Sequence, residues 1–157
     1  MRVLGIDPGT RVTGYGVVDG GDRGSASLVE CGVIRPPRGA PLPDRLADVY
    51  EGVRDLIDRH HPAVLALESV FLRRNVRSTV TLGQAHGVVL LAAAQADIPI
   101  VRYAPAMVKK TVVGMGRAGK GQVGYVVAQL LRLAAPPAPA DAADGVAVAL
   151  THLLRRR

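Results

Sequence analysis

Arg2-Val3-Leu4-Gly5-Ile6-Asp7-Pro8-Gly9-Thr10 is a short apolar run that ends in a carboxylate and a turn. The apolar part predicts a buried strand with Asp7 at its carboxyl end. Pro8 and Gly9 predict a tight turn, with proline fixing φ at one corner and glycine supplying a positive φ at the next. We expect residues 12–18 to return as the hairpin partner of the first strand. Asp7 is either a turn-initiating aspartate or a functional carboxylate, and this segment alone favours neither interpretation.

The hydrophobic pattern of the remaining chain predicts an α/β protein. Residues 12–19 and 26–35 extend the first strand into an antiparallel three-stranded meander. Apolar residues then recur at steps of three and four, which predicts a helix from 42 to about 60. The later predicted elements are strands at 63–67 and 99–103 and helices at 78–96, 105–113, 120–133 and from 141 onward. Together they predict one mixed five-stranded sheet, the meander plus two parallel strands, flanked by helices in a single domain spanning residues 1–157.

The composition favours a globular protein with a polyanionic partner. Apolar residues make up 48% and charged residues 21% of the 157 residues, as in ordinary folded domains. The formal net charge is +7, from 20 basic and 13 acidic residues, and this favours nucleic acid as a partner. A single cysteine, Cys31, excludes an internal disulfide and a thiolate zinc cluster. The longest apolar run, residues 87–94, is too short to span a bilayer, and Asp7 interrupts any signal-peptide core. We therefore expect a cytoplasmic protein without a membrane partner.

Four acidic residues follow buried strands or open the last helix. Asp7 and Glu68 each come directly after an apolar strand, and the carboxyl ends of strands are the usual ligand site of α/β sheets. Asp141 and Asp144 are three residues apart, which places both on one face of a helix. That pair could cap the helix, or the alanine-rich sequence from 142 to 149 could let the helix approach the sheet and bring both aspartates to the strand ends. Four converging carboxylates without cysteine or clustered histidine suit two Mg²⁺ or Mn²⁺ ions, about 3.5–4 Å apart, and a nuclease reaction.

Several short motifs occur along nearly the whole chain in a fixed order. They are Gly5-Ile6-Asp7-Pro8-Gly9-Thr10, Leu67-Glu68-Ser69-Val70-Phe71, Leu82-Gly83-Gln84-Ala85, Val108-Lys109-Lys110-Thr111-Val112-Val113-Gly114, Asp141-Ala142-Ala143-Asp144 and Thr151-His152. As a set they resemble the RuvC family of bacterial Holliday junction resolvases, the crossover junction endodeoxyribonucleases, whose fold is ribonuclease H-like.

The resemblance implies an endonuclease that resolves four-way DNA junctions by paired symmetric nicks, in homologous recombination and repair. It implies that Asp7, Glu68, Asp141 and Asp144 carry the two-metal site. It also implies that Lys109 and Lys120 contact the DNA and that Phe71 lies near the strand crossover. The implied partners are the four-way junction, a second copy of the chain in a homodimer, and the RuvA–RuvB branch-migration machinery.

Two basic segments are candidate DNA-binding surfaces. The loop after Glu68 carries Phe71, Arg73, Arg74 and Arg77, and there arginines could hold phosphates while the aromatic ring stacks on an exposed base. The alternative is that Phe71 packs in the core beneath its loop. The second segment contains Lys109, Lys110, Arg117 and Lys120, and its alternative is a solvated basic face.

The helix expected at 78–96 is apolar on most of its circumference, which is more than one buried face requires. Gly83 and Gly87 lie four residues apart on it and would let another helix approach, so we expect a two-fold dimer with this helix at its interface. Gly145 occupies a position in the last helix where alanine would be the better helix former, by about 1 kcal/mol. His152 lies too far along that helix to share a metal with Asp141, so we expect it to be structural or solvent-facing.

Two other functions fit parts of this pattern. The segment from Gly5 to Thr10 also resembles the first phosphate-binding hairpin of actin- and Hsp70-like ATPases. Those proteins enclose ATP between two related domains, and this length supplies one. The second is a junction-binding protein without catalysis, which would be missing one of the four acids, whereas this sequence has all four.

Overall fold

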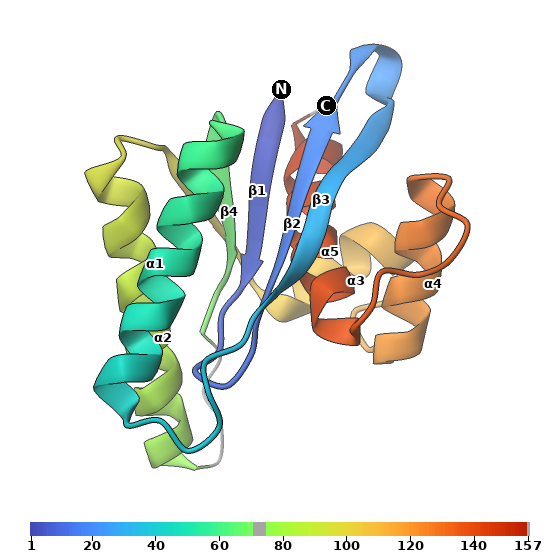
Figure 1. The fold of residues 1–157 in the computed structure, drawn as a ribbon. Helices are drawn as coiled ribbons and strands as arrows, with labels where there is room; N and C mark the ends of the chain where they lie inside the picture. The colour runs from blue at the N-terminus through green and yellow to red at the C-terminus, as the bar shows by residue number, and fades with distance from the viewer. Residues whose placement is uncertain (71–74, 157) are drawn as a thin grey trace.

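The computed structural model describes residues 1–70 and 75–156, and its elements are shown in Figure 1. The strands are β1 (Arg2–Asp7), β2 (Thr13–Gly20), β3 (Ala26–Ile34), β4 (Val64–Glu68) and β5 (Ile100–Tyr103). The helices are η1 (Asp22–Gly24), α1 (Leu42–His60), α2 (Val76–Gln95), α3 (Pro105–Val113), α4 (Lys120–Leu130) and α5 (Ala140–Arg155). The strands form one sheet of order β3-β2-β1-β4-β5. The first three are antiparallel and β4 and β5 run parallel to β1, which confirms the predicted mixed sheet.

The sheet separates two hydrophobic cores because side chains alternate between its faces. Leu4 and Ile6 of β1 pack in the core with α1 and α2. Val3, on the opposite face, packs in the core with α3, α4 and α5. Figure 1 shows the same division, with α1 and α2 covering one face and the other three long helices on the other. Each buried strand therefore needs apolar residues on both faces, which is why β1 and β4 are continuous apolar runs.

Helix α5 lies unusually close to β1 and β2 because glycines face one another at the contact. A Cβ atom on Gly145 would lie 2.4 Å from the Cα of Tyr15 on β2. A Cβ on Gly5 would lie 2.3 Å from the carbonyl oxygen of Gly145, and one on Gly14 would lie 1.8 Å from that of Asp141. No side chain fits into such gaps. The low helix propensity of Gly145 is therefore the cost of a backbone-to-backbone contact that holds the start of α5 over the sheet.

The turn between β1 and β2 is closed by a threonine rather than by the backbone conformation expected from the sequence. Thr13 Oγ1 donates a hydrogen bond to the Gly9 carbonyl at 2.7 Å and accepts one from the Gly9 N–H at 3.1 Å. Gly9 does not have a positive φ, so that expectation is wrong. A Cβ there would lie 2.3 Å from the carbonyl oxygen of Val12, so glycine is required for close approach instead. Asp7 pairs with Gly14 across the turn.

A polar cluster links the sheet to α1 on the side away from α5. Glu30 of β3 accepts hydrogen bonds from Tyr15 at 2.8 Å and from Arg59 at 2.8 Å, and His60 Nε2 lies 2.7 Å from its carboxylate. The hydrogen bond from Arg59, aided by those from Tyr15 and His60, lowers the pKa of Glu30 to about 2, although burial raises it.

This cluster predicts a loss of stability in acid. Because the folded pKa of Glu30 lies below its ordinary value of 4.5, its contribution is present in full above about pH 4.5 and is lost as the pH falls toward 2. Glu30→Gln should therefore lower the free energy of unfolding by about 1–2 kcal/mol at pH 7, and the difference should shrink toward zero near pH 2. Denaturant unfolding at several pH values measures both. Glu51→Gln, at an exposed position of α1, is the control, and a Glu30→Gln difference that is constant with pH would contradict the prediction.

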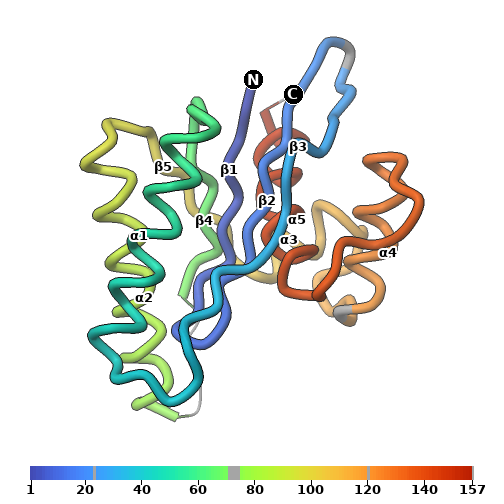
Figure 2. The backbone as a smooth tube through the Cα atoms, viewed as in Figure 1, coloured from blue at the N-terminus to red at the C-terminus, as the bar shows by residue number. Residues whose placement is uncertain are grey.

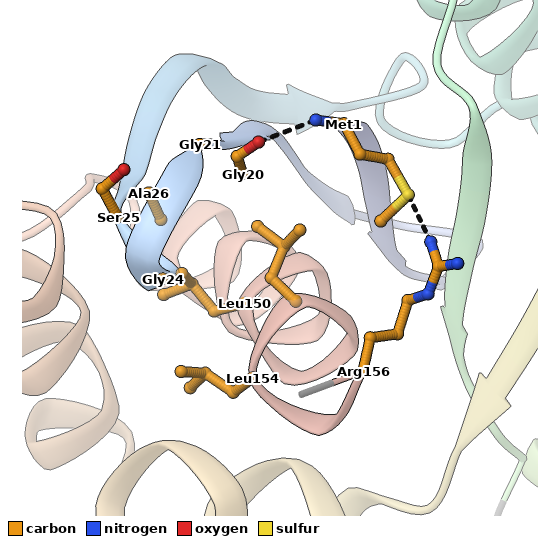
Figure 3. Close-up of a pocket in the computed structure, with 10 residues that line it drawn as sticks. Met1, Gly20, Gly21, Gly24, Ser25, Ala26, Leu150, Leu154 and Arg156 are labelled. Carbon is orange, nitrogen blue, oxygen red and sulfur yellow. Dashed lines mark hydrogen bonds between the residues drawn. The ribbon is translucent and has the colours of Figure 1, made fainter.

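A hollow of about 540 Å³ lies at the amino end of β1, opposite the end that carries Asp7. Figure 3 shows its walls, formed by Met1, the β2–β3 connection and the last turns of α5. The Met1 ammonium group donates to the Gly20 carbonyl at 2.7 Å, and Arg156 contacts the Met1 sulfur. This hollow is therefore separate from the acidic end of the sheet. In the described part of the chain, no helix is long and apolar enough to cross a membrane.

Candidate active site

Asp7 and Glu68 leave the sheet at the same edge and on the same face. Their strands β1 and β4 are parallel neighbours, with Ile6 opposite Leu67, so the next residue of each strand lies at adjacent positions. Alternation places Asp7 on the face of Gly5, which contacts α5, and Glu68 on the face of Ala66, which lies in the α5 core. Both acids are half-buried. The prediction that two strand ends deliver neighbouring carboxylates is consistent with this arrangement.

The first two turns of α5 carry the other two predicted acids to the same end of the sheet. The α5 N-cap is Pro139, whose side chain makes no capping hydrogen bond. Asp141 lies in the first turn, directly over Gly14, the residue that pairs with Asp7. Asp144 is half-buried and precedes Gly145, which contacts Tyr15 of β2. The glycine contact of α5 is therefore what positions both aspartates relative to the strand ends.

Two depressions meet at Asp7. One is a small cavity of about 70 Å³ that Asp7 lines together with Glu68 and His86. The other is an open groove of about 710 Å³ that Asp7 lines together with Asp141. Asp7 thus shares one space with Glu68 and another with Asp141, whereas Asp144 lines neither. We call the larger depression the acidic groove. It is lined by residues 7–12, Arg45, Arg77, Ser78, Thr81, Leu82 and Asp141.

Carboxylates are suitable ligands for hard cations. Among the described residues they share a space in two pairs, Asp7 with Glu68 and Asp7 with Asp141. Within residues 1–70 and 75–156, no group of three or more His, Cys, Asp and Glu side chains is arranged to hold a metal ion. The acids that share a space with Asp7, Glu68 in the cavity and Asp141 in the groove, supply carboxylate oxygens, which Mg²⁺ and Mn²⁺ prefer. The chemistry of this donor set therefore fits such ions, with Asp7 common to both pairs.

His86 is a site residue that the sequence analysis missed. It lies on the buried face of α2 and is only 5% exposed. It lines the small cavity with Asp7 and makes a hydrogen bond to the backbone of Glu68. Burial lowers the pKa of His86, and the nearby charge of Arg102 lowers it further. A histidine on an otherwise apolar helix face was the available signal, and its role here is to hold the end of β4.

Three arginines line the acidic groove beside Asp7. Arg77, at the start of α2, was predicted as a DNA contact, and the structure places it in this groove. Arg11 and Arg45 line the same groove and were missed. Arg45 Nη1 lies 3.5 Å from Thr10 Oγ1 of the β1–β2 turn. The groove therefore combines carboxylates with guanidinium groups, and the guanidinium groups suit the binding of a phosphodiester beside the acids.

None of the other predicted DNA contacts that the structure describes lines the acidic groove. Lys109 is half-buried on α3 and Arg117 is exposed in the α3–α4 loop. Lys110 lines a separate hollow of about 480 Å³ with Arg155, so the structure does not bring it to the acidic groove. Lys120 is the first residue of α4, and its side chain lies outside the described part. Phe71, Arg73 and Arg74 also lie outside the described residues.

His152 is buried, so of the two predicted alternatives the solvent-facing one is wrong. It is 5% exposed on α5, and its Nδ1 lies 2.9 Å from the hydroxyl group of Tyr103 on β5. Burial lowers the pKa of His152. The contact ties the last helix to the edge strand, far from the first turn of α5.

Comparisons with known proteins identify the family that this chain resembles. A family model described as Crossover junction endodeoxyribonuclease RuvC matches residues 3–152. A relative of that description from Pelotomaculum thermopropionicum is 48% identical over 153 residues, which cover 97% of this chain and 92% of the relative. The matched span includes Asp7, Glu68, Asp141 and Asp144.

Solved structures give the same result for the fold. The structure of Thermus thermophilus RuvC superposes with a TM-score of 0.88 at 34% identity, covering 100% of this chain and 96% of the other. Thermus thermophilus RuvC in complex with a Holliday junction substrate gives a TM-score of 0.90 at 32% identity, with the same coverage. The predicted ribonuclease H-like fold is confirmed, and the alternative of an actin- or Hsp70-like ATPase is not supported by these matches.

Proposed function

The chain belongs to the RuvC family of crossover junction endodeoxyribonucleases, and we propose that it resolves Holliday junctions by metal-dependent hydrolysis of two symmetry-related phosphodiester bonds. The observation that carries the proposal is the family match over residues 3–152, with four acids at one end of the sheet. The strong net positive charge supports DNA as the substrate. Its biological setting would be homologous recombination and DNA repair.

We assign Asp7, Glu68, Asp141 and Asp144 to hold two Mg²⁺ or Mn²⁺ ions. When bound, such ions stabilise the negative charge that develops on the attacking and leaving oxygens of the phosphodiester. The protein contributes rigid placement, because these acids come from two strand ends and one helix fixed by backbone contact. His86 holds the backbone of Glu68. Rigid placement lowers the reorganisation that the reaction requires.

The arginines of the acidic groove would orient the DNA strand. Arg11, Arg45 and Arg77 line the space shared by Asp7 and Asp141, where their guanidinium groups would bind the phosphates on either side of the scissile bond. Lys109, Lys110, Arg117 and Lys120 would contact DNA on the α3–α4 side. In the β4–α2 connection, Phe71 would stack on a base at the crossover, with Arg73 and Arg74 holding phosphates beside it.

A homodimer would place one site on each of two symmetric strands, with α2 at the interface. An exposed apolar stripe runs along α2 through Val76, Val80 and Leu91, which are 75%, 57% and 50% exposed. Gly83 and Gly87 lie on the same stripe, and among the described residues an added Cβ would have no heavy atom within 4 Å at either. A large apolar face of this kind on a single helix favours contact with another helix.

Gly87→Leu should therefore weaken the dimer without harming the protomer. The new side chain meets open space within one protomer, so we expect unchanged or higher thermal stability, since leucine is the better helix former by about 0.8–1 kcal/mol. We expect the dimer dissociation constant to rise at least about tenfold, because the glycine gap would be filled. Sedimentation at micromolar concentration measures this. Gly121→Leu, at an open position of α4, is the control. A wild-type monomer, or equal dimerisation by both variants, would contradict the interface.

The remaining partners follow from the same family membership. The RuvA–RuvB branch-migration machinery would deliver the junction to this nuclease. Because the proposed substrate is chromosomal DNA, the activity would take place in the cytoplasm.

The function is tested by incubating the purified chain with a synthetic four-way junction and with a linear duplex of the same sequence. We expect cleavage of the junction in Mg²⁺ or Mn²⁺, much slower cleavage of the duplex, and none in EDTA. Equal cleavage of both substrates would contradict structure-specific recognition. ATP binding by the isolated chain would instead favour the nucleotide-binding alternative.

A further inference from the structure

A second hollow, of about 640 Å³, adjoins the acidic groove on the α1 side of the sheet. Four arginines line it, Arg11, Arg35, Arg38 and Arg45, and we call this set the arginine hollow. Arg11, Val12 and Arg45 line both the arginine hollow and the acidic groove. The two depressions therefore form one continuous tract that leads from Asp7 to the connection between β3 and α1.

The arginine hollow is strongly positive. No aspartate or glutamate among the described residues lines it, and the ion pairs among those residues include none of its four arginines. The Nε atom of Arg45 is buried and has no hydrogen-bond partner in the part of the chain that the structure describes. Guanidinium groups gathered without counter-charges attract anions, and they bind phosphate through two parallel hydrogen bonds.

The backbone of the connection between β3 and α1, which carries Arg35 and Arg38, is restrained by two prolines and a turn. Pro36 is buried between Arg35 and Arg38, and each proline of the pair at 36–37 restricts the backbone. The Ala40 N–H donates to the Pro37 carbonyl at 3.2 Å, which closes a turn. Figure 2 shows this connection running past the turn between β1 and β2, which carries Arg11. Arginines on such a constrained segment lose less conformational entropy on binding.

We propose that the arginine hollow is a binding site for the phosphate backbone of one DNA arm of the junction, beyond the strand that enters the acidic groove. This assignment rests on the proposed function. The continuous tract lets one strand pass from the arm, across Arg11 and Arg45, to the carboxylates. Lys109 and Arg117 belong to the α3–α4 side, on the opposite face of the sheet, so the two basic surfaces hold different arms.

The test compares charge removal in the hollow with equal removal elsewhere. Junction binding is measured as a function of salt concentration, in buffer with EDTA so that nothing is cut, for Arg35→Ala/Arg38→Ala and for Arg54→Ala/Arg156→Ala. Both pairs lose two positive charges, and the second pair lies outside both depressions. Each lost phosphate contact lowers the slope of log affinity against log salt by about 0.9. We expect the first pair to lower the slope by about 1.8 and to weaken binding at least about tenfold near 0.15 M salt, and the control to stay close to wild type. Arg35→Lys/Arg38→Lys, which keeps the charges, should restore most of the slope.

A second measurement locates the contact on the DNA. Junctions with single methylphosphonate linkages, which lack the phosphate charge, should bind the wild-type chain more weakly when the linkage lies in one arm. The Arg35→Ala/Arg38→Ala protein should lose that sensitivity. Two results would overturn the arginine hollow as a DNA site, even if the wild-type chain cleaves the junction. One is an equal salt slope for Arg35→Ala/Arg38→Ala and for the control pair Arg54→Ala/Arg156→Ala. The other is that the Arg35→Ala/Arg38→Ala protein remains sensitive to the methylphosphonate linkage. A wild-type chain that fails to cut the junction would overturn the proposed function itself.

Discussion

Asp7→Asn is expected to lower the rate of junction cleavage by at least about 10³-fold while leaving junction binding intact or tighter. Asp7 is the acid that shares one depression with Glu68 and another with Asp141, so its loss would affect both of the proposed metal positions. Bound metal ions contribute several kcal/mol to stabilising the transition state, and each 1.36 kcal/mol is a tenfold change in rate. Binding should persist because asparagine has the same shape and removes a negative charge that repels DNA. Single-turnover cleavage and gel-shift titration in parallel measure the two effects.

The matched control is Asp58→Asn, an exposed aspartate of α1 outside both depressions. It should cleave within about twofold of wild type. If Asp7→Asn is folded but no longer binds the junction, Asp7 has a role in DNA recognition beyond metal binding. If it is folded and cleaves normally, the assignment of the metal site is wrong.

Gly145→Ala is expected to destabilise the protein by about 2–4 kcal/mol, although helix propensity alone predicts a gain of about 1 kcal/mol. The added methyl group would lie 2.4 Å from the Cα of Tyr15 and 2.5 Å from its backbone nitrogen. Because the contact is between the backbones of α5 and β2, the methyl group can be accommodated only if α5 moves away from the sheet. For a domain of this size we expect the melting temperature to fall by about 5–15 °C. Thermal unfolding followed by circular dichroism measures the change.

The same substitution should also slow cleavage at a temperature where the variant is folded. Asp141 and Asp144 sit on the part of α5 that Gly145 holds against the sheet, so a lifted helix moves them from the strand ends. Gly121→Ala in α4, where an added Cβ would have no heavy atom of a described residue within 4 Å, should be neutral or slightly stabilising. A stabilised Gly145→Ala protein with full activity would contradict the close-packed contact.

Elements with a strong hydrophobic period could be predicted closely from the sequence. The helix expected from 42 to about 60 is α1, Leu42–His60, because its apolar residues recur at helical steps. The helix expected to begin at residue 78 begins at Val76 instead. Its start is set by Asn75, whose side chain accepts hydrogen bonds from the backbone N–H groups of Arg77 and Ser78, a local capping signal that the apolar period does not carry.

The four candidate acids could be singled out from the sequence because each follows a recognisable local pattern, an apolar strand or a helix start. Arg11 and Arg45 could not, because they meet only when the β1–β2 turn and the start of α1 pack together. The prediction that alanine would be the better residue at position 145 fails for a related reason. Propensity describes an isolated helix, whereas the requirement for glycine comes from the opposing backbone of β2.

The most direct test of the account is to map the cuts that the purified chain makes in a synthetic four-way junction, with each of the four strands labelled in turn. We expect nicks at symmetry-related positions in two opposing strands, in Mg²⁺ or Mn²⁺, and no nicks in EDTA or with Asp7→Asn. Intact strands in both metals, from a folded chain that binds the junction, would contradict the account and identify a junction-binding protein without catalysis.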